Sequence, residues 1–519
     1  MKTKKESNQI GVWNGVWMLF SMIAGITFIM NFGAFNGEGE NNSGNHIGFH
    51  IIWIIALLAV VVLATAWAFI KLLKIHPTAN GGGAQYVRTA FGKFAGLIYS
   101  ACSIFVISLL FMSMIVSIRQ SFIETTIGDK YIFNFLNNWS TLFYDVFGII
   151  LATCAALVAF NGVNKLKKVS TLIAYLSWFI TALIAIGALI IIFGGSYSER
   201  GPIKSEINYS SFQVAFLALF FSFGGFETFI NTGRAIKNRD KNLPKIIFIS
   251  IILSAVFFIT FSLLILFSLV SEFGGTPNME IFKRIDKNLA IGFGIPIILF
   301  YMIINRFNSL TQIAFYGSNA TEPLVAQKYL PKKLGTLNDK NIARYCLVGL
   351  LILNLAFSFV FLVIPDIIQG ATGKPSPFDF TSIVQITSLF FVLMYGLVVS
   401  AAIFHGIKKN IKVRIVEYII WAIVVMLLLF VLGNYCKDVF GVFFDKNANI
   451  QKIYSSVIQI VTFISILTLC LILHFVYNKK AIDKLSSEEL IEFEKYENNI
   501  YRVISAEEKQ QHALIEETT

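Results

Sequence analysis

Residues 216–244 read FLALFFSFGGFETFINTGRAIKNRDKNLP, an apolar helical stretch that contains Gly224 and Gly225, keeps the carboxylate of Glu227 and ends in a basic loop. Every backbone N–H and C=O group must find a partner inside lipid, and a double glycine weakens the helix that supplies those partners. Interrupted helices persist in membranes where the freed groups face a cavity or a ligand. We therefore predict a membrane helix that opens at residues 222–225 and offers its backbone atoms to a ligand.

The composition is that of an integral membrane protein. The 519 residues are 56% hydrophobic and 14% charged, with a mean hydropathy of +0.70, which is too apolar for a soluble core of this size. Apolar stretches of roughly 20 residues, the length that crosses a hydrocarbon layer of ~30 Å, recur along almost the whole chain. A β-barrel would instead show alternating segments of roughly 10 residues. The predicted fold class is an all-α polytopic membrane protein.

Several other classes are disfavoured by the same sequence. The five cysteines lie in or beside apolar stretches without a C-x-x-C pair or a histidine cluster, so we expect reduced packing residues and neither a metal nor a cofactor. The net charge of +12 is spread over the loops, so we expect no nucleic-acid partner. A Walker motif and a nucleophile–histidine pair are both missing, which argues against an ATPase and against a membrane enzyme.

We expect twelve membrane helices. They lie near residues 12–35, 48–73, 94–118, 142–160, 170–193, 212–231, 245–270, 289–316, 343–364, 380–404, 413–435 and 453–477. Lys and Arg residues alternate between the loops. Of the 42, 30 lie in the N-terminal tail, in every second loop after it and at the adjoining helix ends, and 11 lie in the other loops. Since cytoplasmic loops attract Lys and Arg, both termini are predicted to be cytoplasmic.

This topology predicts an internal inverted repeat. Helix 1 runs outward and helix 6 runs inward, so helices 1–5 and 6–10 form two oppositely oriented halves. The first helix contains Ala24-Gly25-Ile26-Thr27 at mid-span. Gly25 alone is typical of helix packing, but its matched position in the other half favours a second interruption. The predicted divisions are an N-terminal tail (1–11), a transport core (12–404), helices 11 and 12 (405–477) and a C-terminal tail (478–519).

Three motifs resemble those of the amino acid–polyamine–organocation (APC) superfamily. Residues 77–87, PTANGGGAQYV, follow helix 2 and are similar to the superfamily's P-x-x-GG-x-Y-x-Y-like loop. Residues 221–227, FSFGGFE, match its F-x-F-x-G-F-E pattern, and residues 160–163, FNGV, resemble its L-N-x-x-G-V-like turn. The order and spacing are consistent over residues 10–410. The motifs are specific for the superfamily and say little about the substrate.

The resemblance implies a five-plus-five inverted-repeat (LeuT-like) fold, with helices 1 and 6 discontinuous, that moves amino acids or related amines by alternating access. It also implies a binding site. Backbone N–H groups at Ala24, Gly25, Ile26 and Thr27 would hold a substrate carboxylate, and backbone carbonyls at Ser222, Phe223 and Gly224, beside Gly225, would hold its ammonium. Helix ends favour such charges. Phe221 matches an aromatic gate position, although it can equally be a packing ring.

Arg306 and Glu227 are the candidate coupling residues. An arginine in the middle of a membrane helix is rare unless it is paired or lines a cavity. We hypothesise that Arg306 places a fixed positive charge where a sodium ion would otherwise bind, near the helix 1 interruption, and that it pairs with Glu227. Transport would then be sodium-independent. The alternatives are that Arg306 forms a structural ion pair or reaches a water-filled vestibule. Glu227 either carries a proton or ties helix 6 to a neighbour through hydrogen bonds.

The leading prediction is a secondary active transporter of amino acids in the cell membrane, working as a uniporter, a proton symporter or an exchanger. Its partners would be the amino acid, membrane lipid and protons. The alternatives are a carrier of polyamines or organic amines, and a nutrient sensor or channel that keeps the fold without the transport cycle. A sensor would usually carry a large soluble domain, for which the C-terminal tail is short. The particular amino acid and the oligomeric state stay open.

Overall fold

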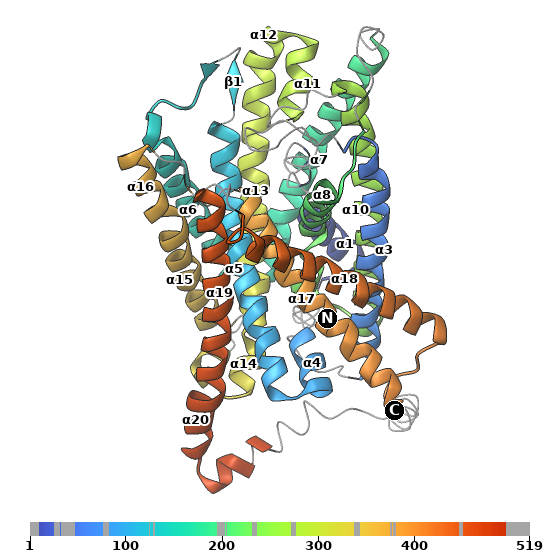
Figure 1. The fold of residues 1–519 in the computed structure, drawn as a ribbon, viewed down its shortest axis with the longest axis vertical. Coiled ribbons are helices and arrows are strands. Elements are labelled where there is room, and N and C mark those ends of the chain that lie inside the picture. Colours follow the sequence, from blue (N-terminus) through green and yellow to red (C-terminus); the bar gives the residue numbers. More distant parts are fainter. Residues whose placement is uncertain are drawn as a thin grey trace, which may run out of the picture.

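The computed structural model describes residues 10–24, 28, 32, 47–75, 82–123, 125–127, 130–194, 203, 205–230, 236–270, 277–336, 343–373, 376, 380–445, 450–491 and 493–494. Within these ranges nearly all of the regular structure is helical, and most of the helices run along the longest axis of the molecule (Figure 1). A short antiparallel hairpin pairs β1 (Thr126–Ile127) with β2 (Lys130–Tyr131). The predicted all-α fold class is confirmed.

The helices that build the fold follow one another along the chain with short connections between many of them. In chain order they are α1 (Val12–Ile23), α3 (His50–Leu73), α4 (Gly83–Phe91), α5 (Lys93–Ile123), α6 (Ser140–Ala159), α7 (Val163–Phe193), α8 (Tyr209–Phe223), α9 (Phe226–Ile230), α10 (Arg239–Leu269), α11 (Pro277–Ile285), α12 (Lys287–Leu289), α13 (Ile295–Ala320), α14 (Glu322–Ala326), α15 (Arg344–Ser358), α16 (Ile364–Thr372), α17 (Phe380–Ile407), α18 (Ile415–Gly441), α19 (Ile450–Ile472) and α20 (Lys479–Asp483). Short 3₁₀ turns lie at Asn137–Trp139 and Lys332–Gly335, and π turns at Ala290–Gly294, Phe359–Val363 and Leu473–Asn478.

Ten helical stretches among the described residues are long and apolar enough to cross a membrane. They correspond to the predicted helices 2–5 and 7–12. The apolar stretches at the two remaining positions are shorter, Val12–Ile23 and Ser211–Phe223, and these are the two helices for which the sequence predicts interruptions. The chain is therefore a multi-pass membrane protein.

Two of the long helices contain a π turn directly before a proline, and one of these helices extends beyond its predicted end. Residues 290–294 precede Pro296, and residues 359–363 precede Pro365. Proline has no N–H and its ring crowds the carbonyl four residues earlier, and a π turn relieves both problems without ending the helix. The ninth span accordingly continues to Thr372, whereas the sequence predicts its end near residue 364.

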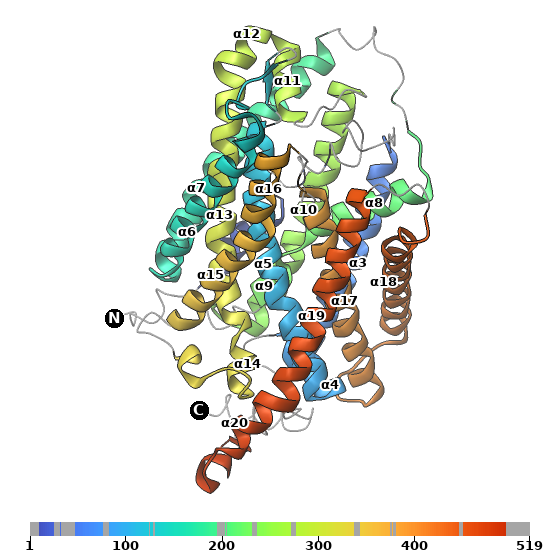
Figure 2. The ribbon, with the colours of Figure 1, turned by 60° about the vertical axis from the view of Figure 1, so that its left-hand side comes forward.

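The helices are arranged around α5. Of the 18-residue apolar segment of α5, 89% is buried inside the protein. The helix packs against α13, α17, α6, α15 and α19. The helix α18 lies at the edge of the molecule in Figure 2, and only 22% of the apolar segment of α18, and likewise of the span that contains α19, is buried. A peripheral helix that is apolar on all sides faces lipid. The burial pattern thus separates a packed centre from a lipid-exposed rim.

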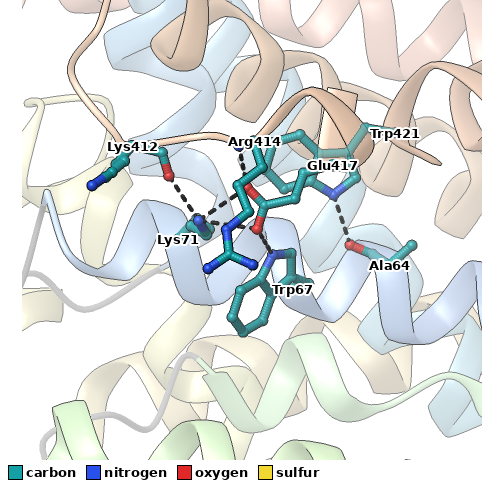
Figure 3. Close-up of polar contacts among 7 residues, drawn as sticks. All are labelled: Ala64, Trp67, Lys71, Lys412, Arg414, Glu417 and Trp421. Atoms are coloured by element: carbon teal, nitrogen blue, oxygen red, sulfur yellow. Dashed lines mark hydrogen bonds and ion pairs between the residues drawn. The ribbon is translucent and has the colours of Figure 1, made fainter. Parts of the chain in front are cut away.

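A polar junction attaches the peripheral helix α18 to α3 (Figure 3). The Glu417 carboxylate accepts hydrogen bonds from Trp67 Nε1 at 2.7 Å and from Lys71 Nζ at 3.1 Å. One turn further along α18, Trp421 Nε1 donates to the Ala64 carbonyl oxygen at 3.1 Å. These bonds cross between segments far apart in the sequence, so they fix the start of α18 against the packed part of the fold.

Candidate functional site

The helical stretch from residue 209 to 230 is interrupted at Gly224 and Gly225. The helix α8 ends at Phe223, Gly224 is extended (φ −65°, ψ 159°), and α9 begins at Phe226. Gly225 has φ +114°, a region that side chains rarely adopt. A Cβ on Gly224 would lie 2.5 Å from the Phe391 ring. Both positions therefore require glycine, and the interruption lies within the residues for which the sequence predicts it.

Glu227 lies immediately beyond the interruption and is only 2% exposed. Its two carboxylate oxygens accept the Gly225 backbone N–H at 3.1 and 3.0 Å, and Oε2 also accepts the Tyr395 hydroxyl at 2.7 Å. The Gly225 N–H is one of the donors that a helix start leaves without an intrahelical partner. Glu227 thus satisfies a freed backbone group and ties the helix to α17. A role as a proton carrier stays a prediction.

A pocket of about 20 Å³ opens at the interruption. It is lined by Met22, Ile23, Leu110, Met114, Phe221, Ser222, Gly224, Ser309 and Ile313. Four separate elements meet there: the end of α1, the middle of α5, the end of α8 and the middle of α13. A cavity needs about 10–15 Å³ to hold one water molecule. In this conformation the pocket, called the helix 6 pocket below, has room for about one water-sized group.

The helix 1 side of the predicted site is described only in part. The helix α1 ends at Ile23, and the Ala24 N–H closes its last turn on the Phe20 carbonyl at 2.7 Å. Gly25, Ile26 and Thr27 lie outside the described residues. A Cβ built on Gly225 would lie 3.0 Å from Met22 Cε, so the end of α1 directly contacts the helix 6 interruption. The structure therefore brings the end of α1 and the helix 6 interruption together.

The predicted helix 6 residues divide into two groups. Phe221, Ser222 and Gly224 line the pocket. Phe223 packs its ring edge-on against Phe258 of α10, with 5.0 Å between the ring centroids, and its side chain is not among the pocket-lining groups. Any contact of Phe223 with a ligand in this pocket would therefore come from its backbone.

Arg306 lies on α13 and is completely buried. Its Nη1 atom donates to the Met114 sulfur at 3.2 Å, and Met114 itself lines the pocket. Ser309, on the next turn of α13, also lines it. The guanidinium group is therefore separated from the helix 6 pocket by a single flexible thioether side chain. The predicted pairing of Arg306 with Glu227 stays a prediction.

Several residues of the site were not expected from the sequence. Tyr395, Leu110 and Met114 come from α17 and α5, which are apolar around most of their circumference. Hydrophobic periodicity cannot assign an inward face to such a helix. The sequence offers one indication for Tyr395, namely that its polar hydroxyl lies within a membrane span and needs a hydrogen-bond partner there.

The fold and site together define a multi-pass helical membrane protein with a glycine-interrupted helix at a small buried pocket. Residues 10–466 match the amino acid permease family, and the chain belongs to that family. This match confirms the resemblance to the APC superfamily, and the family consists of transporters, not enzymes.

The chain is also similar to the glutamate/serine transporter AimA of Bacillus subtilis (strain 168). The two are 24% identical over 337 residues, which cover 62% of this chain and 62% of that protein. The similar stretch therefore spans less than two thirds of the relative's length.

Proposed function

We propose that this protein is a secondary active transporter that moves amino acids across the cell membrane by alternating access. The observation that carries the proposal is the interruption at Gly224 and Gly225, which opens onto a pocket shared with the end of α1. We infer twelve crossings, namely the ten long stretches and the two short helices, arranged as two inverted halves. The distribution of Lys and Arg supports cytoplasmic termini.

We infer that both ends of a zwitterionic substrate would find a complementary group beside the ends of α1 and α8. The carbonyl end of α8 at Ser222, Phe223 and Gly224 carries partial negative charge and would bind the ammonium group. The chain that follows α1, from Gly25 to Thr27, would supply backbone N–H groups to the carboxylate, whereas the Ala24 N–H already closes the last turn of α1. An ordinary unbroken helix would offer neither, since its peptide groups bond to each other.

Alternating access requires the pocket to enlarge, because about 20 Å³ is too small for any amino acid. Met22 and Met114 line it with flexible thioether chains that repack at low cost. On the side where α1 begins, the Lys237 N–H donates to the Ile10 carbonyl at 3.1 Å and Ile10 pairs with Ile236. This contact joins the chain before α1 to the chain after α9. We infer that it closes the cytoplasmic side and separates when the pocket opens there.

Arg306 supports sodium-independent transport and small polar or acidic substrates. A buried guanidinium beside the pocket repels a second cation, so it disfavours both a bound sodium ion and a polyamine. Two polar side chains near Arg306 on α13 are engaged within the helix, so their oxygens already have partners: Thr311 Oγ1 donates to Phe307 O, and Asn308 Oδ1 accepts from Gln312 Nε2. The relative named for glutamate and serine places these two amino acids first among the substrates to test.

Counterflow in proteoliposomes tests the proposal. Vesicles loaded with unlabelled glutamate, serine or another amino acid are diluted into trace labelled amino acid, with sodium or choline as the external cation. A carrier gives transient, saturable accumulation of label, and we expect equal rates in both salts. Flux without counterflow would identify a channel, and ligand binding without flux would identify a sensor. Strict sodium dependence would refute the proposed role of Arg306 while leaving the transporter assignment intact.

A further inference from the structure

Three charged side chains meet inside the helical part of the protein, away from the helix 6 pocket. Arg119 lies near the end of α5, Asp145 near the start of α6, and Asp366 on α16. The two aspartates are fully buried and Arg119 is 7% exposed. Arg119 Nη1 donates to Asp145 Oδ2 at 2.7 Å and to Asp366 Oδ1 at 3.3 Å. This aspartate cluster therefore places two carboxyl groups on one guanidinium.

Within the described residues, the second oxygen of each carboxyl group has no donor. Asp145 Oδ1 and Asp366 Oδ2 are both buried, and neither has a hydrogen-bond partner in the part of the chain that the structure describes. Both carboxyl groups contact the same Arg119 Nη1 atom, so the two groups are close neighbours. Two ionised carboxylates at that distance repel, and one buried negative charge would be left without compensation. A single proton removes the excess charge and supplies the missing donor.

Among the residues that the structure describes, the elements packed on α6 and α16 bring no second cation to the cluster. Among the described residues, the charged groups that act on Asp366 are Asp145 and Arg119. The 3₁₀ turn at Asn137–Trp139, which packs on α16 and on α6, is uncharged. Tyr144, beside Asp145, donates its hydroxyl to the Phe133 carbonyl. The other helices packed on α6 carry their cationic groups elsewhere: Lys165, Lys167 and Lys168 in the first turns of α7, Arg344 at the first residue of α15, and Arg306 of α13 against Met114.

We propose that Asp145 and Asp366 share one proton, with Arg119 balancing the single negative charge that remains, so that the aspartate cluster is a proton-binding site separate from the helix 6 pocket. Release of the proton breaks one carboxyl O–H bond, passes the proton to water and leaves two carboxylates facing one guanidinium. The repulsion then favours separation of α16 from α6. Since α5 carries both Arg119 and the pocket-lining residues Leu110 and Met114, occupancy of the proton site affects a helix that forms the pocket wall.

Infrared spectroscopy of the purified full-length protein in lipid nanodiscs at pH 7 tests this proposal without any transport assay. The carbonyl stretch of a protonated carboxyl group is separate from the bands of ionised carboxylates and shifts in deuterated water. We expect such a band in the wild type and its loss in D145N and in D366N, because one remaining carboxylate pairs fully with Arg119. The exposed Asp438 on α18 provides the matched control, D438N, and E227Q separates any band that belongs to Glu227.

Two results would overturn the proposal. The first is a spectrum with no carboxylic acid band that depends on Asp145 or Asp366. The second is a band that disappears when sodium chloride is added at constant pH, since the site would then hold a metal cation in place of a proton. If the asparagine variants do not fold, D145E and D366E keep both carboxyl groups, and each must shift the band without removing it. The counterflow assay tests the transporter assignment independently of this proposal.

Discussion

Replacing Gly225 with alanine tests whether the interruption of helix 6 is required for transport. The residue has φ +114°, and holding an alanine there costs roughly 1–3 kcal/mol. The added Cβ would lie 3.0 Å from Met22 Cε, which is the end of a flexible side chain and can move away. The backbone strain at positive φ is therefore a larger cost than the contact with Met22. Alanine instead favours a continuous helix, in which the peptide groups bond to each other and are no longer available to a ligand. At 1.36 kcal/mol per tenfold, the interrupted form becomes about 5- to 150-fold less populated.

The assay is counterflow at equal amounts of reconstituted protein, alongside two comparison variants. In G224A the cost is steric, because the Cβ meets the Phe391 ring at 2.5 Å and the Phe221 backbone oxygen at 3.1 Å, so F391L should partly restore activity to G224A and leave G225A impaired. In G433A, on α18, the added Cβ has no neighbour within 4 Å, and we expect wild-type transport. Wild-type counterflow by G225A, with an unchanged melting temperature, would refute the reasoning.

Three further substitutions test the contacts around the site. Glu227→Gln leaves an amide donor beside the Gly225 N–H or the Tyr395 hydroxyl, so the melting temperature should fall by the equivalent of about 1–3 kcal/mol, and an unchanged value would contradict the structural role. The same variant, if it keeps pH-dependent uptake, excludes Glu227 as the proton carrier. Arg306→Met should allow sodium to stimulate uptake, measured as a sodium-to-choline rate ratio above the wild-type value; an unchanged ratio would count against a fixed cation there. Glu417→Gln should lower thermal stability by about 1–3 kcal/mol through the α3 junction while leaving substrate affinity unchanged, and a changed affinity would mean that α18 contributes to the site.

Linkage gives a fourth expectation, for the aspartate cluster. If the folded protein holds one proton that the unfolded chain releases above about pH 4, then near neutrality the unfolded state binds fewer protons than the folded state. Stability therefore falls as pH rises, by up to about 1.4 kcal/mol per pH unit for one proton. Thermal unfolding of the wild type and D366N between pH 6 and 8 measures the slope, and equal slopes would contradict the shared proton.

The parts of the fold that depend on the cost of bare backbone in lipid could be predicted from the sequence. Gly224 and Gly225 lie in an apolar stretch with a carboxylate two residues further on, and that combination indicates an interruption without reference to any neighbour. The positions of the ten long helices followed from apolar length in the same way. The exact ends of these helices did not follow, since the ninth helix continues through a π turn and Pro365 to Thr372, beyond its predicted end near residue 364.

Contacts between distant helices could not be predicted. Tyr395 binds Glu227 across 168 positions, and no local pattern links them. Arg119 and Asp145 lie near helix ends, where charged residues resemble ordinary loop residues, and Asp366 lies beyond the predicted end of its helix. Their burial depends on how α5, α6 and α16 pack, which a single sequence does not encode at short range. The direction in which α5 presents Leu110 and Met114 was hidden for the same reason.

Substrate protection of a thiol at the pocket tests the central claim most directly. In a background without the five native cysteines, S222C would be modified by a membrane-permeant reagent with and without a transported amino acid. The control is T462C, because Thr462 lines a second cavity of about 20 Å³ between α5, α17 and α19, away from the interruption. We predict that the amino acid slows modification of S222C and leaves T462C unaffected. Equal rates at S222C with and without a saturating, transported amino acid would contradict the account.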